Sequence, residues 1–202
     1  MGRFTVTDLP LHGLKRVQRE RLGDSRGFLA RLFCAEELAA FGWSGPIAQI
    51  NHTRTSRQGT VRGLHFQHAP HAEIKLVSCL RGRIWDVAVD LREDSPTFGC
   101  WHAAELSADN GRALLIPQGC AHGFQTLSDD VELLYCHSAA YAANAEGGVH
   151  PQDERLAIPW PLPITELSVR DAGHPRLGAI HRALAFSSCE QAAAPNVKGL
   201  PG

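Results

Sequence analysis

The stretch of this chain between residues 47 and 138 is a succession of short strand-like segments separated by turn residues. The predicted strands cover residues 47–53, 60–67, 74–81, 83–91, 100–106, 112–117, 123–127 and 131–138. Turn sequences such as Arg81-Gly82, Asp109-Asn110-Gly111 and Pro117-Gln118-Gly119 stand between them. Because many short strands at this spacing are typical of antiparallel sandwiches and barrels, we expect an all-β fold.

Helical signals are sparse in this sequence. The clearest covers residues 35–41 and ends at Gly42, which takes the position of a helix C-cap. A second lies near residues 177–185. We therefore expect a few short peripheral helices around a single domain that spans residues 1–186. Residues 187–202 are small and polar and contain Pro and Gly, which predicts a flexible C-terminal tail.

The composition excludes several classes of protein. The chain of 202 residues is 44% hydrophobic and 20% charged, which is ordinary for a globular domain with its own core. Its formal net charge of -1 creates no overall field that favours nucleic acid or an anionic membrane. No apolar run reaches the length of a signal peptide or a membrane span, so we expect a cytoplasmic protein. The six cysteines include no Cys-x-x-Cys pair, which argues against a structural zinc site.

The predicted strand over residues 83–91 shows the clearest alternation. Trp85, Val87 and Val89 share one apolar face. Asp86 lies on the opposite face, between two small or apolar neighbours. A carboxylate in that position either lines a cavity or belongs to a wet outer face, and the alternation is compatible with both.

Three residues on two neighbouring predicted strands carry the strongest chemical signal. His65 and Arg62 lie in Arg62-Gly63-Leu64-His65-Phe66-Gln67, and Lys75 lies on the next strand. The side chains of His65 and Gln67 point the same way on a strand, and the glycine two residues before His65 lets a ligand approach closely. A base, an anion clamp and a cation together suit proton abstraction next to a carbonyl. The alternative is a hydrogen-bonded structural histidine.

Other polar residues are weaker candidates on their own. His122 follows the turn Pro117-Gln118-Gly119 and would lie at the mouth of a small barrel, or serve turn packing only. Zinc or iron binding by His65, His68 and His71 ranks below a metal-free site, because three-residue spacing in extended chain does not put them on one face.

Taken in order, the motifs resemble those of the nucleotide-sugar 3,5-epimerases. The stretches that carry the resemblance are Gly23 to Phe28, Arg62 to Gln67, Lys75-Leu76-Val77, Trp85 to Asp90, Ser95 to Gly99, Glu105 to Ala108, Ile116 to Phe124, Leu134-Tyr135 and Leu167 to Asp171. The resemblance implies a cupin-type jelly roll and a homodimer that exchanges N-terminal strands. It also implies a nucleotide-diphosphate sugar substrate and no cofactor or metal.

The resemblance also implies roles for individual residues. His65 would be the general base, oriented by Asp171, and Tyr135 the opposing general acid. Lys75 would stabilise an enolate oxygen at C4. The residues implied in holding the substrate are Arg62 and His122 at the sugar and diphosphate, and Arg26, Gln49, Asn51, Glu146 and Arg170 in the nucleotide-sugar envelope.

These roles describe an epimerase that inverts C3, C5 or both in a 4-keto-6-deoxy nucleotide sugar, in rhamnose or other deoxysugar biosynthesis. The C4 ketone acidifies the neighbouring hydrogens, and the resulting enolate needs a cation aimed at its oxygen. The alternatives are a mono-epimerase acting on a sugar with a different base, such as CDP, a ketoisomerase or metal-dependent oxygenase, and a non-catalytic cupin.

Among the departures from the family pattern, three bear on the choice of substrate and of the inverted centre. Arg31 stands where glutamate is usual and Ile50 where an acidic residue is usual, so we hypothesise altered base recognition. Ala140 replaces an aromatic residue beside Tyr141, which would restrict epimerisation to one centre or reflect drift at a tolerant position.

Overall fold

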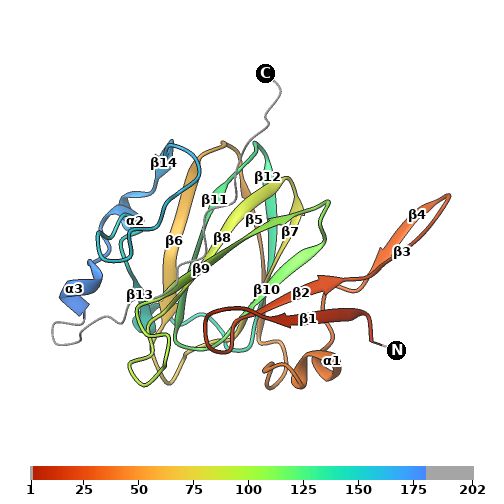
Figure 1. Cartoon of the computed structure of the whole chain (residues 1–202), viewed down its shortest axis with the longest axis horizontal. Helices are drawn as coiled ribbons and strands as arrows, with labels where there is room; N and C mark the ends of the chain where they lie inside the picture. The colour runs from red at the N-terminus through yellow and green to blue at the C-terminus, as the bar shows by residue number, and fades with distance from the viewer. Residues whose placement is uncertain (1, 181–202) are drawn as a thin grey trace.

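Two sheets face each other and enclose the apolar residues that alternate along the central strands (Figure 1). The structure, a computed structural model, describes residues 2–180. The first sheet has the order β1 (Phe4–Asp8), β2 (Lys15–Arg19), β10 (Arg112–Ile116), β7 (Lys75–Arg81), β12 (Val131–His137) and β5 (Gln49–Thr55). The second has the order β13 (Glu146–Gly148), β6 (Thr60–Gln67), β11 (Cys120–Thr126), β8 (Arg83–Asp90) and β9 (Trp101–Ser107).

The remaining elements are short and peripheral. β14 (Glu166–Leu167) pairs with β6 in parallel, whereas the other strand pairs of the described chain are antiparallel. The helices are α1 (Ala35–Ala39), the 3-10 helix η1 (Ala143–Ala145), α2 (Val169–Ala172) and α3 (Leu177–Ile180). This architecture confirms the predicted all-β fold of cupin type with a few short helices. The predicted tail and the end of the second predicted helix lie outside the described residues.

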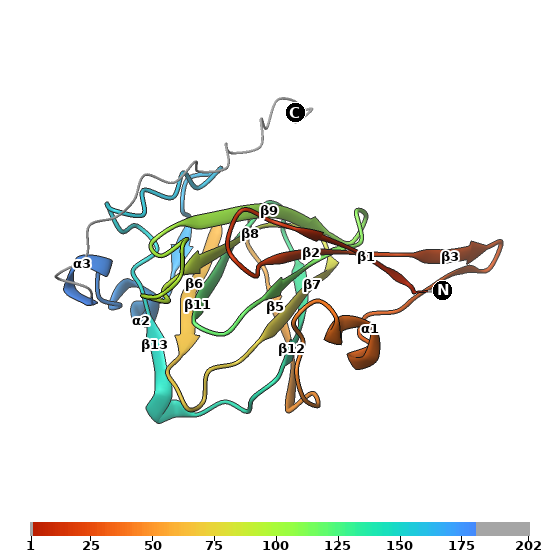
Figure 2. The ribbon, with the colours of Figure 1, turned by 60° about the horizontal axis from the view of Figure 1, so that its bottom comes forward.

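The hairpin of β3 (Arg21–Asp24) and β4 (Gly27–Ala30) projects away from both sheets (Figure 2). Its apolar side chains Leu22, Phe28 and Leu29 are exposed, Leu29 by 71%. Sequence patterning did not predict β1 to β4. β1 and β2 contain only two apolar residues and one apolar residue, respectively, and the apolar residues of the β3–β4 hairpin are mostly exposed within this chain. No helix of the described chain is long and apolar enough to cross a membrane.

β8 is buried on both faces, which decides the position of Asp86. Trp85, Val87 and Val89 pack under the segment that contains Leu156 and Ile158. The opposite face of β8 looks into the space between the two sheets, where Ile84 and Ala88 join the central core. Asp86 lies between them with no exposed surface. It therefore belongs to the interior of the barrel and not to a solvent-exposed outer face.

β6 and β11 approach each other unusually closely where the candidate residues lie. A Cβ atom on Gly63, whose φ is +127°, would lie 2.5 Å from the Cα of Gly123. Both the positive φ and the lack of space require glycine at this position. The register shifts directly after His122, which pairs with His65 across the two strands. The glycine contact therefore brings two histidines side by side at one end of the barrel.

Candidate active site

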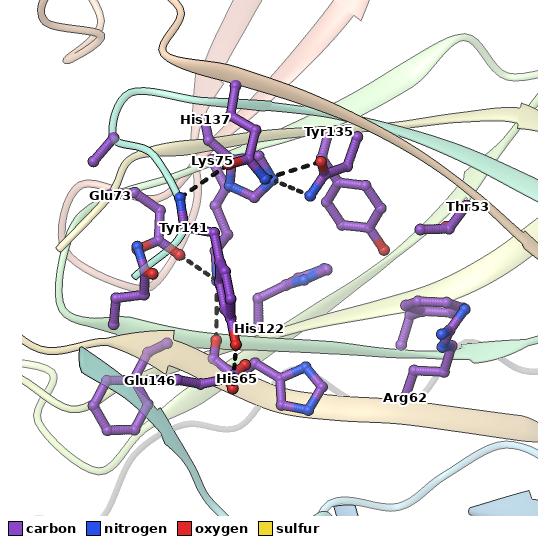
Figure 3. Close-up of a pocket in the computed structure, with 16 residues that line it drawn as sticks. Thr53, Arg62, His65, Glu73, Lys75, His122, Tyr135, His137, Tyr141 and Glu146 are labelled. Atoms are coloured by element: carbon purple, nitrogen blue, oxygen red, sulfur yellow. Dashed lines mark hydrogen bonds and ion pairs between the residues drawn. The ribbon is translucent and has the colours of Figure 1, made fainter. Parts of the chain in front are cut away.

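A cavity of about 260 Å³ opens between the two sheets at this end of the barrel (Figure 3). Its walls come from β5, β6, β7, β11 and β12 and from residues 139–146. The lining residues are Gln49, Asn51, Thr53, Arg62, His65, Phe66, Gln67, Glu73, Lys75, His122, Phe124, Tyr135, His137, Ala139, Tyr141 and Glu146. The cavity is therefore rich in groups that bind anions and transfer protons.

His65 is held by a carboxylate from a distant part of the sequence. Its Nε2 donates to Oδ1 of Asp171 at 2.8 Å, and the other oxygen of Asp171 accepts from the Gly63 N–H at 3.2 Å. Burial by itself would raise the pKa of Asp171, but the hydrogen bond and charge of His65 and the bond from Gly63 outweigh it, and this pKa lies below its usual value. An ionised carboxylate only accepts, so the proton of the neutral ring sits on Nε2 and the lone pair on Nδ1.

α2 presents Asp171 to the strand from outside the sheet. The Ser168 hydroxyl caps this helix by accepting from the Asp171 N–H at 3.0 Å. Asp171 itself is only 4% exposed. The histidine side chain is about one-third exposed, at 32%. The His65 ring is therefore accessible from the cavity, while the carboxylate of Asp171 is held in a fixed position.

Lys75 is a buried cation inside the cavity. Its Nζ lies 3.0 Å from Oε1 of Glu73 and donates to the backbone oxygen of His65 at 3.0 Å. The same glutamate accepts a hydrogen bond from Gln67 at 2.9 Å. Because both charged side chains are more than nine-tenths buried, their attraction is weakly screened by solvent. The ammonium group is thus held in place for an anion that enters the cavity.

Tyr135 projects from β12 on the wall opposite His65 (Figure 3). Its ring packs edge-on against His122, with centroids 5.8 Å apart, and stacks on His137 at 5.9 Å. Burial raises the pKa of Tyr135 above its usual value, so the phenol remains protonated at neutral pH. Burial, together with the charge of Lys75, lowers the pKa of His137 to about 4, so that neighbour is neutral.

His122 forms a second histidine–carboxylate pair, deeper in the barrel. Its Nε2 lies 2.7 Å from Oδ1 of Asp86. Both residues are buried, and Oδ2 of Asp86 has no partner among the described residues. Burial raises the pKa of Asp86, against the opposing effects of the His122 charge and hydrogen bond and of the Lys75 charge.

The residues expected to hold the nucleotide sugar are only partly gathered here. Gln49, Asn51, Arg62 and Glu146 line the cavity. Arg170 lies at its edge and forms an ion pair with Glu146. Arg26 lies far from them in the β3–β4 turn, exposed and paired with Asp24, so one chain does not bring it to the cavity.

The comparison with protein families decides what kind of site this is. Residues 8–179 match the family model described as dTDP-4-dehydrorhamnose 3,5-epimerase. The chain belongs to this family. It is therefore an isomerase, a carbohydrate epimerase, as the order of its sequence motifs predicts.

Relatives within the family agree in sequence and in structure. The dTDP-4-dehydrorhamnose 3,5-epimerase of Salmonella typhimurium is 45% identical over 159 residues, which cover 77% of this chain and 85% of the relative. The dTDP-4-dehydrorhamnose 3-epimerase of Streptomyces niveus is 40% identical over 164 residues, which cover 81% of this chain and 79% of the relative. A solved epimerase from Legionella pneumophila, in complex with dTDP-4-keto-L-rhamnose, has a TM-score of 0.83 and 38% identity, and the match covers 89% of this chain and 95% of that one.

Several residues of this epimerase site were not selected from the sequence. His137 becomes a neighbour of Lys75 only when β7 and β12 pair, whereas Glu73 lies just two residues before Lys75 in the sequence. His174 packs edge-on against His65, with ring centroids 5.3 Å apart. The Asp-x-x-His spacing of Asp171 and His174 was the available signal, because residues three apart share a face of a helical turn.

Proposed function

We propose that this protein inverts C3 and C5 of a dTDP-linked 4-keto-6-deoxy sugar by proton abstraction through an enolate. The observation that carries the proposal is the placement of His65 and Tyr135 on opposite walls of one cavity, with Lys75 between the sheets. Inversion needs a base on one face of the carbon and an acid on the other. A module that only binds the nucleotide sugar needs no such opposition.

Nδ1 of His65 takes the proton from C3, and the electron pair of the C–H bond moves into the ring to form the C4 enolate. Asp171 stabilises the imidazolium that results, because its carboxylate is already ionised and fixed by the Gly63 N–H. The Tyr135 hydroxyl then delivers a proton to the opposite face of C3. Exchange with solvent restores both residues, and the same cycle at C5 completes the reaction.

Lys75 stabilises the enolate oxygen. Its ammonium group is buried and already oriented by Glu73, so little reorganisation is needed when charge develops at C4. Its hydrogen bond to the backbone oxygen of His65 couples the position of the cation to that of the base. Arg62, on the same strand as His65, provides a further positive charge for the diphosphate.

We propose that the dTDP nucleotide is retained despite the departures at Arg31 and Ile50, because the similar epimerases are named for dTDP-linked sugars. The Arg31 guanidinium is paired with Glu37, and the Ile50 side chain is 57% exposed on the outer edge of β5. Neither residue lines the cavity of this chain. Tighter binding of CDP than of dTDP in a competition assay would contradict this part of the proposal.

We further propose that the protein acts as a homodimer. The projecting β3–β4 hairpin exposes Phe28 by 64% and Leu29 by 71%, and Arg26 stands in its turn. Such apolar surface is unfavourable in water unless another chain covers it. Light scattering of the full chain and of Phe28→Asp would test this: the variant should shift to the monomer mass.

Inversion at C3 alone is the second candidate. The relative from Streptomyces niveus is a 3-epimerase at nearly the same identity as the 3,5-epimerases. Ala140, a small residue, precedes Tyr141, which lines the cavity. Turnover of dTDP-4-keto-6-deoxyglucose in heavy water, followed by mass spectrometry and NMR, separates the two. We expect deuterium at C3 and C5; deuterium at C3 alone identifies the mono-epimerase, and none at either centre contradicts both.

A further inference from the structure

His174 is a histidine beside the base that the proposed reaction does not use. It follows Asp171 by three residues, just after α2, and its ring lies against the ring of His65. Nε2 of His174 is buried and has no hydrogen-bond partner among the described residues. A buried ring nitrogen without a partner is unfavourable, and a ligand that binds it relieves that penalty.

Gly148 in β13 makes the room for this ring. A Cβ atom at that position would lie 2.3 Å from Cε1 of His174. Gly148 also pairs with His65 across β13 and β6. The absence of a side chain therefore lets the imidazole of His174 pack on the strand that neighbours the base, and α2 lies beside β6 in Figure 1.

Together with Asp171, the two histidines form a set of ligands with the spacing of a metal site. Their ligand atoms all lie within 4.8 Å of one another. Oδ1 of Asp171 is 2.8 Å from Nε2 of His65 and 3.9 Å from Nε2 of His174. In a tetrahedral zinc site with bonds of roughly 2.0–2.2 Å, neighbouring ligand atoms are about 3.3–3.6 Å apart. The two measured distances from Oδ1 of Asp171 lie on either side of that range.

We propose that His65, Asp171 and His174 bind a zinc ion that inhibits the enzyme. Two imidazoles and one carboxylate are a preferred donor set for Zn²⁺, with water as the fourth ligand. His65 and Asp171 also line a second groove between β6 and residues 166–171, which gives an ion access to them. This site differs from the one considered on His65, His68 and His71, because His68 and His71 do not join the described cluster.

Inhibition follows from which nitrogen of the His65 ring carries the proton. It rests on the proposed role of His65 as the base. In the metal-free site Nε2 carries the proton that is donated to Asp171, and Nδ1 is free to accept one from the substrate. Zinc bound at Nε2 displaces that proton, so the single proton of the neutral ring must sit on Nδ1. The ring then has no lone pair for abstraction.

Zinc binding is measured first without any substrate. The full chain, freed of metal with EDTA, is titrated with Zn²⁺ by calorimetry and with Co²⁺ by visible absorption, which reports tetrahedral coordination. We expect one equivalent to bind, with affinity weakened at least about tenfold in His174→Gln and His174→Ala. His12→Ala, which removes an exposed histidine from the loop between β1 and β2, is the matched control and should bind like the wild type. Circular dichroism establishes that each variant is folded.

The inhibition is measured second, relative to the metal-free rate of each variant. Zinc should stop deuterium incorporation in the wild type and in His12→Ala, EDTA should restore it, and both His174 variants should need about tenfold more zinc. Equal zinc affinity in the wild type and in folded His174 variants would overturn the site. Tight, His174-dependent binding without inhibition would overturn the inhibitory role. If the metal-free protein epimerises nothing, the proposed function fails, while the binding result still decides the metal site.

Discussion

Two histidine–carboxylate pairs lie at the same end of this barrel, and they differ in their surroundings. His65 and Asp171 join β6 to α2 at the edge of the cavity, whereas His122 and Asp86 join β11 to β8 inside the barrel. The two hydrogen bonds have nearly the same length, 2.8 and 2.7 Å. The histidine of the first pair is one-third exposed, and that of the second is 6% exposed.

The carboxylates respond in opposite directions to these surroundings. Asp171 receives a second hydrogen bond from the Gly63 N–H, and its pKa falls below the usual value despite burial. Oδ2 of Asp86 has no partner in the described chain, and burial raises its pKa. The same two residue types therefore form a pair with an ionised carboxylate at the cavity edge, and a buried pair that packs against Tyr135 inside the barrel.

The largest expected effect comes from removing the exposed histidine. His65→Asn should lower turnover by roughly 10²–10⁴-fold, because the asparagine side chain cannot take up the proton that the proposed reaction transfers to the His65 ring. His122→Asn leaves the base in place and should lower kcat by about tenfold, with most of its effect on KM. Steady-state kinetics of both variants measure this difference. Equal losses in kcat would mean that the two pairs do not have separate roles.

Tyr135→Phe should separate exchange from inversion. The base can still remove and return the proton on its own face, so deuterium should enter the substrate while net inversion falls by about a hundredfold. The chain has two tyrosines, and Tyr141→Phe is the control because its hydroxyl donates to Glu146 at the mouth. That control should change KM without changing the ratio of exchange to inversion, followed by NMR. Parallel loss of exchange and inversion in Tyr135→Phe would contradict its role as the opposing acid.

Gly63→Ala should displace both histidine–carboxylate pairs, because the contact of Gly63 with Gly123 sets the distance between β6 and β11. We expect the free energy of unfolding in urea to fall by about 2–4 kcal/mol. Gly27→Ala is a matched control, since its φ is also positive, at +135°, but no atom lies within 4 Å of the added Cβ. It should lose about 1 kcal/mol. Similar losses would show that backbone strain, and not the close approach, decides the effect.

The smallest effects should distinguish the two carboxylates by pH. The lowered pKa of Asp171 means that its ionised form contributes stability above the unfolded value, about 3.9, and that this is lost as pH falls. The raised pKa of Asp86 means that its contribution is complete below about 3.9 and is lost as pH rises. Relative to the wild type, Asp171→Asn should therefore become less stable as pH rises toward about 3.9, and Asp86→Asn should become more stable as pH rises above about 3.9.

Thermal unfolding between about pH 2 and 8 measures this divergence, because the Asp171 effect lies below the unfolded pKa and the Asp86 effect above it. A change of 1 kcal/mol corresponds to about 2–4 °C for a chain of this size, so shifts of a few degrees are resolved. Curves that move in the same direction for both variants would contradict the assignment of opposite shifts.

The sequence predicted the central strands well, because their apolar residues alternate and turn residues separate them. The prediction for residues 60–67 coincides with β6, and that for residues 83–91 with β8 to within one residue. The start of β11 was placed three residues late, because it is buried along its whole length and shows no alternation. The N-terminal strands were missed for different reasons: β1 and β2 contain few apolar residues, and the β3–β4 hairpin exposes its apolar residues within one chain.

What the sequence alone determined is the fold class and the family, because both depend on local patterns and on the order of motifs along the chain. What only the tertiary structure decided is which of these residues meet. Asp171 reaches His65 across 106 positions, and Asp86 reaches His122 across 36. Hydrogen bonds and burial at such separations depend on sheet pairing and on the close approach of Gly63 to Gly123, and no local pattern specifies which side chains these bring into contact.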